Sequence, residues 1–191
     1  MEGQESVDME LVPIAPPTLL QYIKLQHEKI LAAVIAQIEL ILIVIAIVSF
    51  TAILTGLIIW KRENIVEAVT GFWSVVFTIP SLAMFIFLIG VVGLGWVPAI
   101  IALTLYGQLP VVRNTVVGLR SVDPAIIESA QAMGMRPFAV LRKIQFPLAW
   151  PIIIVGIRVS CMLTFGISSI AAYVGGPGSV SYTHLRAHET S

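Results

Sequence analysis

The apolar run from Ile30 to Trp60 limits what this chain can fold into more than any other feature of the sequence. Its only charged residue is Glu39. A helix needs about 20 apolar residues to cross the hydrocarbon core of a bilayer, and this run is longer than that. Composition agrees, because 58% of the 191 residues are hydrophobic and only 12% are charged. We therefore expect an all-α integral membrane protein.

Further apolar stretches predict about four membrane spans in all. The expected spans are Ile38–Trp60, Phe72–Val92, Trp96 to about Val112, and Ala149–Tyr173. The first would place Gln37 and Glu39 at its outer mouth. Pro80 should kink the second, because proline removes one backbone donor and crowds the preceding turn. The third helix could continue as far as Leu119, beyond the bilayer.

The two ends of the chain differ in composition from the apolar part. Residues 1–29 are polar and acidic, and we expect them to form a flexible extracytoplasmic leader. Residues 179–191 resemble the translated read-through of a sequencing adapter, which predicts a non-native tail on a truncated chain whose natural sequence continues past Gly178. A genuine short polar C-terminus is the alternative.

The segment Asp123–Pro147 is too polar to lie in a bilayer and has the start and stop signals of two short helices. Asp123 is a suitable N-cap, and the proline after it suits the first helical position. Gly134 can adopt the left-handed conformation that ends a helix. Pro137 should begin the second helix, and Pro147 should end it. We predict a water-exposed helical hairpin between the third and fourth spans.

Basic residues predict the orientation of the spans. They gather in the hairpin region and after the first span: Lys61, Arg62, Arg113, Arg120, Arg136, Arg142 and Lys143. Because Lys and Arg are enriched in cytoplasmic loops, both segments should be cytoplasmic. The N-terminus would then lie outside.

The hairpin carries the pattern E-S-A-x3-G-x9-I-x-F-P. It closely resembles the EAA loop of ABC-importer permeases, E-A-A-x3-G-x9-I-x-L-P, with Ser129 and Phe146 as the two departures. In that family the loop forms cytoplasmic coupling helices that lie in a groove of the ATPase subunit. The resemblance assigns coupling to Glu128, Ser129, Ala130, Gly134, Ile144 and Pro147.

A longer resemblance covers Phe77 to Met135, including I-P-S-L-A at 79–83 and L-P-V-V-R-N-T at 109–115. This stretch is similar to permease subunits of osmoprotectant importers for glycine betaine, carnitine and choline. The likeness implies a MetI-like ABC permease helix bundle over residues 30–178. It departs at the turn G-G-P-G, 175–178, where G-x-G-G-L-G is more usual.

The resemblance also implies an assembly. A transport subunit of this kind is not an enzyme, and it would work with two ATPase subunits that carry ATP and Mg²⁺, a second permease subunit and an extracytoplasmic substrate-binding protein. It would lie in the cell (inner) membrane of a bacterium or archaeon as a multi-pass protein. A MetI-like permease for an amino acid, a metal or an oxyanion is the alternative, followed by a membrane scaffold or an intramembrane enzyme.

Arg158 lies inside the fourth expected span, where a charge is costly. It could pair with Glu39 or a backbone carbonyl as a structural brace. It could line the translocation path, where it could bind the carboxylate of a betaine. If the span starts later than expected, Arg158 could instead extend to the membrane interface.

Three aromatic residues, Trp73, Trp96 and Tyr106, could offer ring faces to a quaternary ammonium group. An interfacial belt at the span ends explains them equally well. The sequence has no G-x4-G-K-[ST], no H-E-x-x-H and no cluster of cysteine and histidine. It therefore predicts no cofactor or metal bound by this chain, and nothing in it points to nucleic acid.

Overall fold

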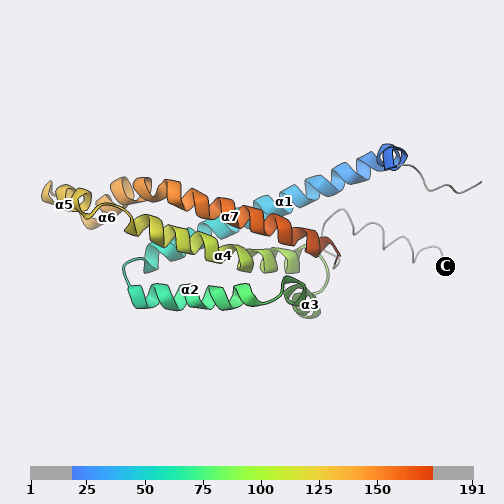
Figure 1. Ribbon diagram of the computed structural model, residues 1–191, viewed down its shortest axis with the longest axis horizontal. Coiled ribbons are helices and arrows are strands. Elements are labelled where there is room, and N and C mark those ends of the chain that lie inside the picture. The colour runs from blue at the N-terminus through green and yellow to red at the C-terminus, as the bar shows by residue number, and fades with distance from the viewer. Residues whose placement is uncertain (1–18, 174–191) are drawn as a thin grey trace, which may run out of the picture.

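The computed structural model describes residues 19–173, which form helices and no strand (Figure 1). The elements are α1 (Leu19–Ile59), α2 (Glu63–Thr78), α3 (Ser81–Val92), α4 (Trp96–Arg120), α5 (Pro124–Ala132), α6 (Pro137–Val140), the π-helical turn η1 (Leu141–Gln145) and α7 (Phe146–Tyr173). The expected leader before residue 19, the turn at 175–178 and the tail at 179–191 lie outside the described residues.

Helix α4 is the centre of the bundle and contacts α1, α2, α3 and α7. Figure 1 shows it between α7 and α2. Glycines bring α4 and α7 together. A Cβ added to Gly107 would lie 2.7 Å from Ser160 Oγ, and one added to Gly156 would lie 2.7 Å from Asn114 Cβ. Small residues at such crossings let helix backbones approach closely inside a membrane.

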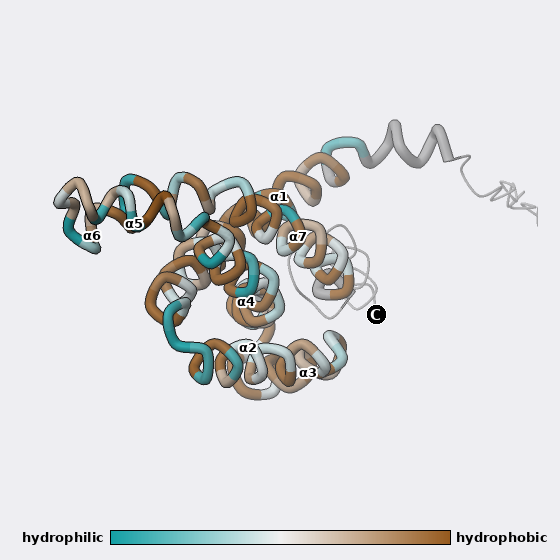
Figure 2. The backbone as a smooth tube through the Cα atoms, turned by 60° about the vertical axis from the view of Figure 1, so that its left-hand side comes forward, coloured by the Kyte–Doolittle hydropathy of each residue, from teal (hydrophilic) through white to brown (hydrophobic). Residues whose placement is uncertain are grey.

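The outside of the bundle is apolar. Many large hydrophobic side chains are exposed along it, for example Leu42, Phe50, Ile86, Phe87 and Met162. Figure 2 shows hydrophobic colouring along most of the helical backbone. Three described helical segments are long and apolar enough to cross a membrane: Ile30–Ile59, Trp96–Arg120 and Pro137–Ile170. The structure therefore confirms an all-α fold, and its exterior is apolar.

The first helix begins much earlier than expected. It runs from Leu19, so residues 19–29 are helical and not part of a flexible leader. Leu, Gln, Lys and Glu dominate this stretch and are good helix formers, and no Gly or Pro interrupts it. Figure 1 shows the start of α1 extending past the other helices.

The second expected span is broken, not kinked. Helices α2 and α3 meet at an angle of 90° across Ile79 and Pro80. Ile79 has φ −66° and ψ 128°, the extended conformation that a following proline favours. Residues Glu63–Thr70, which precede the expected second span, form the first half of α2.

Pro147 does not end a second short helix. The chain continues from α6 through η1 into α7, and the backbone N–H of Phe146 donates to the carbonyl of Leu141, five residues earlier. A proline clashes with the carbonyl four residues before it, and the wider π-helical turn accommodates Pro147 without ending the helix. The third and fourth expected spans are confirmed, with α4 reaching Arg120 and α7 beginning at Phe146.

Candidate functional site

The predicted hairpin, residues 123–147, lies at one end of the bundle, here called the hairpin end (Figure 1). Asp123 caps α5, because its Oδ1 accepts a hydrogen bond of 2.8 Å from the backbone N–H of Ala125. Gly134 turns the chain with φ +84°, and nothing lies within 4 Å of where its Cβ would be. The expected cap and the expected left-handed glycine are both confirmed, and they fix the shape of the turn.

The motif residues have different environments. Glu128, Ser129 and Pro147 are exposed, Ile144 is half-buried, and Ala130 is buried. Two large apolar side chains are exposed on the same hairpin: Met133 is 76% exposed and Phe138 is 71% exposed. Exposed apolar groups in a polar segment mark a protein contact surface. The signal for Phe138, a lone aromatic residue between Arg136 and Arg142, was present in the sequence but was not used.

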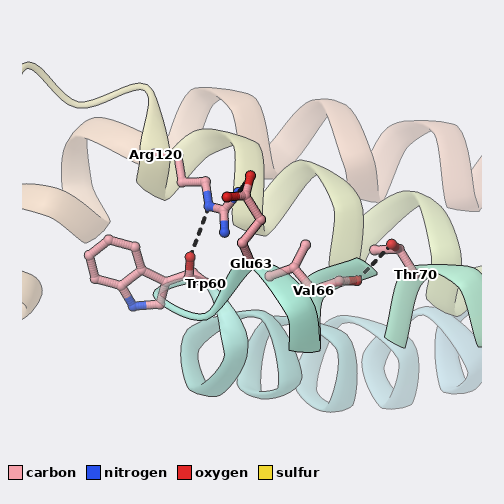
Figure 3. Close-up of polar contacts among 5 residues, drawn as sticks. All are labelled: Trp60, Glu63, Val66, Thr70 and Arg120. Carbon is pink, nitrogen blue, oxygen red and sulfur yellow. Dashed lines mark hydrogen bonds and ion pairs between the residues drawn. The ribbon is translucent and has the colours of Figure 1, made fainter. Parts of the chain in front are cut away.

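The base of the hairpin is tied to the turn between α1 and α2. Figure 3 shows Arg120, the last residue of α4, whose Nε donates to the carbonyl of Trp60 at 2.8 Å. Its guanidinium also lies 3.8 Å from Glu63, but these side chains are 37% and 77% exposed. Such an exposed ion pair contributes little, whereas the bond to Trp60 joins two helix ends directly. The hairpin therefore begins three residues after Arg120, whose position this hydrogen bond fixes.

Helix register excludes the proposed brace between Arg158 and Glu39. Val48 faces Gly107 and Gly56 faces Thr115, so each residue of α1 lies level with the residue 59 positions later in α4. Glu39 is thus level with Pro98. Gly156 faces Pro110, which puts Arg158 near the level of that residue. The two charges are about 18 Å apart along the bundle. Within residues 19–173, Arg158 has no ion pair or hydrogen bond.

The interfacial alternative for Arg158 stays a prediction. The apolar helical stretch that contains it runs from Pro137 to Ile170 and includes the second half of the hairpin. Arg158 lies level with the tenth residue before the end of α4, which is about 15 Å from the hairpin end. Arg113 of α4 is exposed and lies within about one helical turn of the same level. A charge inside the hydrocarbon core costs about 2.5–3.5 kcal/mol on insertion scales unless protein or water surrounds it.

The three aromatic candidates are not brought together. Tyr106 is only 3% exposed, and its hydroxyl donates to the carbonyl of Ile79 at 2.6 Å. That carbonyl lies at the break between α2 and α3, where it has no later helical N–H to accept from. Trp73 is half-buried against the core, and Trp96 is exposed at the start of α4. Tyr106 therefore stabilises the break and is not available to a solute in this conformation.

Replacing Tyr106 by phenylalanine should destabilise the protein by about 1 kcal/mol, because the carbonyl of Ile79 would lose its partner. Thermal unfolding in detergent measures the loss. Uptake per folded molecule should stay close to the wild-type value, since the ring remains in place. A tenfold loss of uptake without a change in unfolding temperature would restore the solute-contact hypothesis.

Polar pairs inside the bundle are a feature that sequence reasoning missed. Gln108 donates to Thr51 Oγ1 at 2.7 Å, Ser160 donates to the carbonyl of Gly107 at 3.1 Å, and Gln37 donates to Ser168 Oγ at 3.0 Å. These bonds join α1 to α4, α7 to α4 and α1 to α7. Serine and threonine recur at every fourth position of α7 (Ser160, Thr164 and Ser168), which was a usable signal, but their partners depend on the register of the helices.

The fold and the hairpin together define a multi-pass helical membrane protein with an exposed helical hairpin at one end. The chain belongs to the family described as "Binding-protein-dependent transport system inner membrane component", which matches residues 49–191. It is therefore a permease component of a transport system, as its resemblance implied.

Two curated relatives and one solved structure support this assignment. The choline transport system permease protein OpuBB of Bacillus subtilis is 32% identical over 167 residues, or 87% of this chain and 77% of the relative. The glycine betaine/carnitine/choline permease protein OpuCB of the same organism is 39% identical over 148 residues, or 78% and 67%. The inward-facing MetNI methionine ABC transporter has the same fold, with a TM-score of 0.72, 18% identity and coverage of 88% and 85%.

Proposed function

We propose that this chain is the transmembrane permease subunit of an ATP-driven importer for osmoprotectants such as glycine betaine, carnitine or choline. The observation that carries the proposal is the capped, exposed hairpin with the E-S-A-x3-G spacing at the hairpin end. The names of the relatives support the solute class, because they are choline, carnitine and glycine betaine permeases.

The hairpin is built to pass a displacement into the membrane. Helix α6 continues through η1 into α7, so a displacement of the hairpin moves a membrane-spanning helix directly. The bond from Arg120 to Trp60 carries the same movement to the turn between α1 and α2. In the proposed mechanism, two ATPase subunits bind ATP, close together and pull on the hairpins of two permease subunits. The spans then switch between inward-open and outward-open states.

The basic residues support a cytoplasmic position for the hairpin end. Both polar turns at that end carry lysine or arginine, whereas the turn at Gly93–Gly95 at the opposite end has no charge. We therefore propose that the chain lies in a bacterial or archaeal inner membrane with its N-terminus outside. A separate extracytoplasmic binding protein would deliver the solute at the outer side. The ATPase would be another chain, because this sequence has no phosphate-binding loop.

The test is uptake of radiolabelled glycine betaine at high osmolarity in a cell that lacks its own transporters. The chain is expressed with its complete operon, and the control operon has the P-loop lysine of the ATPase replaced. Uptake should depend on both the permease and that lysine. No uptake of glycine betaine, carnitine or choline, but uptake of an amino acid, metal or oxyanion, would overturn the solute class and keep the importer.

A further inference from the structure

The hairpin carries opposite charges on its two arms. The exposed acidic residues, Asp123 and Glu128, lie on residues 123–132, here called the acidic arm. The exposed basic residues lie on residues 136–143, here called the basic arm: Arg136, Arg142 and Lys143. In the part of the chain that the structure describes, the Asp123 side chain caps α5, and the other four charged side chains form no ion pair or hydrogen bond. Their charges can therefore meet a partner.

Phe138 is an exposed aromatic side chain among the basic groups. It is 71% exposed near the start of α6, with Arg136 two residues before it and Arg142 about one helical turn after it. Met133, at the end of α5, is 76% exposed. Phe, Met and Arg are residue types enriched in protein interfaces, where an apolar core is surrounded by a polar rim. The hairpin has both parts of such an interface.

The position of the hairpin favours a protein over a lipid surface as the partner. Figure 1 shows α5 and α6 beyond the ends that α1, α2 and α4 have on that side. An anionic lipid surface attracts basic residues, but it would repel the two carboxylates of the acidic arm. A protein groove can offer both signs of charge and can therefore match both arms.

We infer that the hairpin enters the groove of the ATPase in one fixed direction, with Phe138 in an apolar pocket that has acidic residues beside the basic arm and basic residues beside the acidic arm. This inference rests on the proposed function and names the chemistry of its partner. Complementary charges speed association and suppress wrong partners. A groove with the reverse distribution would bring like charges together, so the two arms select the ATPase of this transporter over others.

Two pairs of variants test the apolar and the charged contact separately. The affinity of the ATPase from the same operon for the purified permease is measured in detergent at low and at high salt. Thermal unfolding of each permease variant reports its folding. Phe138→Ala is compared with Phe165→Ala, whose ring is 55% exposed on α7. Arg142→Glu is compared with Lys61→Glu, which makes the same change of charge on an exposed residue outside the hairpin.

Phe138→Ala should weaken ATPase binding by about tenfold or more at both salt concentrations. Arg142→Glu should weaken it by about tenfold at low salt and less at high salt, because salt screens exposed charges. A single change of an acidic groove residue to lysine should restore binding of this variant, and both controls should bind like the wild type. Wild-type affinity of either hairpin variant, or an equal loss in its control, would overturn the inference. No binding by the wild-type permease would instead contradict the proposed function.

A solvent-sensitive fluorophore tests the lipid surface as the partner. It is attached to Phe138→Cys in a Cys161→Ser background, and the permease is placed in bilayer discs that contain phosphatidylglycerol. The emission should be that of a water-exposed probe until the ATPase is added, and it should then move to shorter wavelength. A shift in the discs before the ATPase is added would show that the hairpin binds lipid and would overturn the inference.

Discussion

Replacing Gly134 by valine should weaken binding of the ATPase partner by roughly fivefold to thirtyfold while the helix bundle stays folded. Gly134 has φ +84°, and a residue with a Cβ pays about 1–2 kcal/mol in this conformation, more if it is β-branched. Nothing lies within 4 Å of the added Cβ, so the cost is confined to the backbone of the hairpin. The hairpin would adopt a different turn. Glu128 and Phe138 would then no longer have the relative positions that they have in the wild type.

Co-purification of the ATPase with the tagged permease measures this loss, and thermal unfolding of the permease alone measures the state of the bundle. Gly166→Val is the matched control, because Gly166 lies inside α7 with ordinary helical dihedrals and with nothing within 4 Å of an added Cβ. It should bind the ATPase like the wild type. Normal ATPase binding by the Gly134 variant would show that the hairpin is not the contact, or that it adapts on binding.

Replacing Gly156 by leucine should separate the two central helices and abolish uptake. A Cβ at this position would lie 2.7 Å from Asn114 Cβ and 2.9 Å from the carbonyl oxygen of Pro110, which is backbone and cannot rotate away. Overpacking of this kind costs about 1–3 kcal/mol or more. The bonds that join α4 to α7 in the next turn, such as that from Ser160 to Gly107, would be lost as well.

The measurement is the unfolding temperature in detergent together with uptake by the complete transporter. Gly166→Leu has no neighbour to displace and should unfold near the wild-type temperature. Asn114→Gly combined with Gly156→Leu should recover part of the stability, because it removes one of the two contacts. A Gly156 variant as stable as the wild type would contradict the close crossing of α4 and α7.

Local chemistry was enough to predict the parts of the fold that depend on neighbouring residues. The Asp123 cap, the left-handed Gly134 and the apolar length of α4 and α7 follow from a few adjacent side chains each. Proline was harder to interpret. Neither Pro80 nor Pro147 has a backbone N–H to donate. The helix breaks by 90° at Pro80, whereas a π-helical turn accommodates Pro147. At the break before Pro80 the hydroxyl of Tyr106 donates to the carbonyl of Ile79, 27 residues earlier in the chain, and such long-range partners are not visible in the sequence.

The candidate site shows the same difference between local features, which the sequence predicts, and long-range contacts, which it does not. The spacing from Glu128 to Pro147 located the hairpin, because the motif is local. The suggested pair of Arg158 and Glu39 is not formed within residues 19–173, because such a pair depends on the register between α1, α4 and α7, which glycine contacts set. The bond from Arg120 to the carbonyl of Trp60 could not be predicted from the sequence either. The two residues are 60 positions apart, and every residue has a backbone carbonyl that could accept.

Disulfide cross-linking of the hairpin to the ATPase tests the coupling role most directly. Cys161, the single cysteine and an exposed one, is first replaced by serine, and Ser129→Cys is introduced on the exposed side of α5. Cysteines are then placed singly along the groove of the ATPase subunit from the same operon. The account predicts a cross-link at one or two adjacent groove positions, with a yield that changes when ATP is added. A complex that transports glycine betaine but forms no cross-link from position 129 would contradict it.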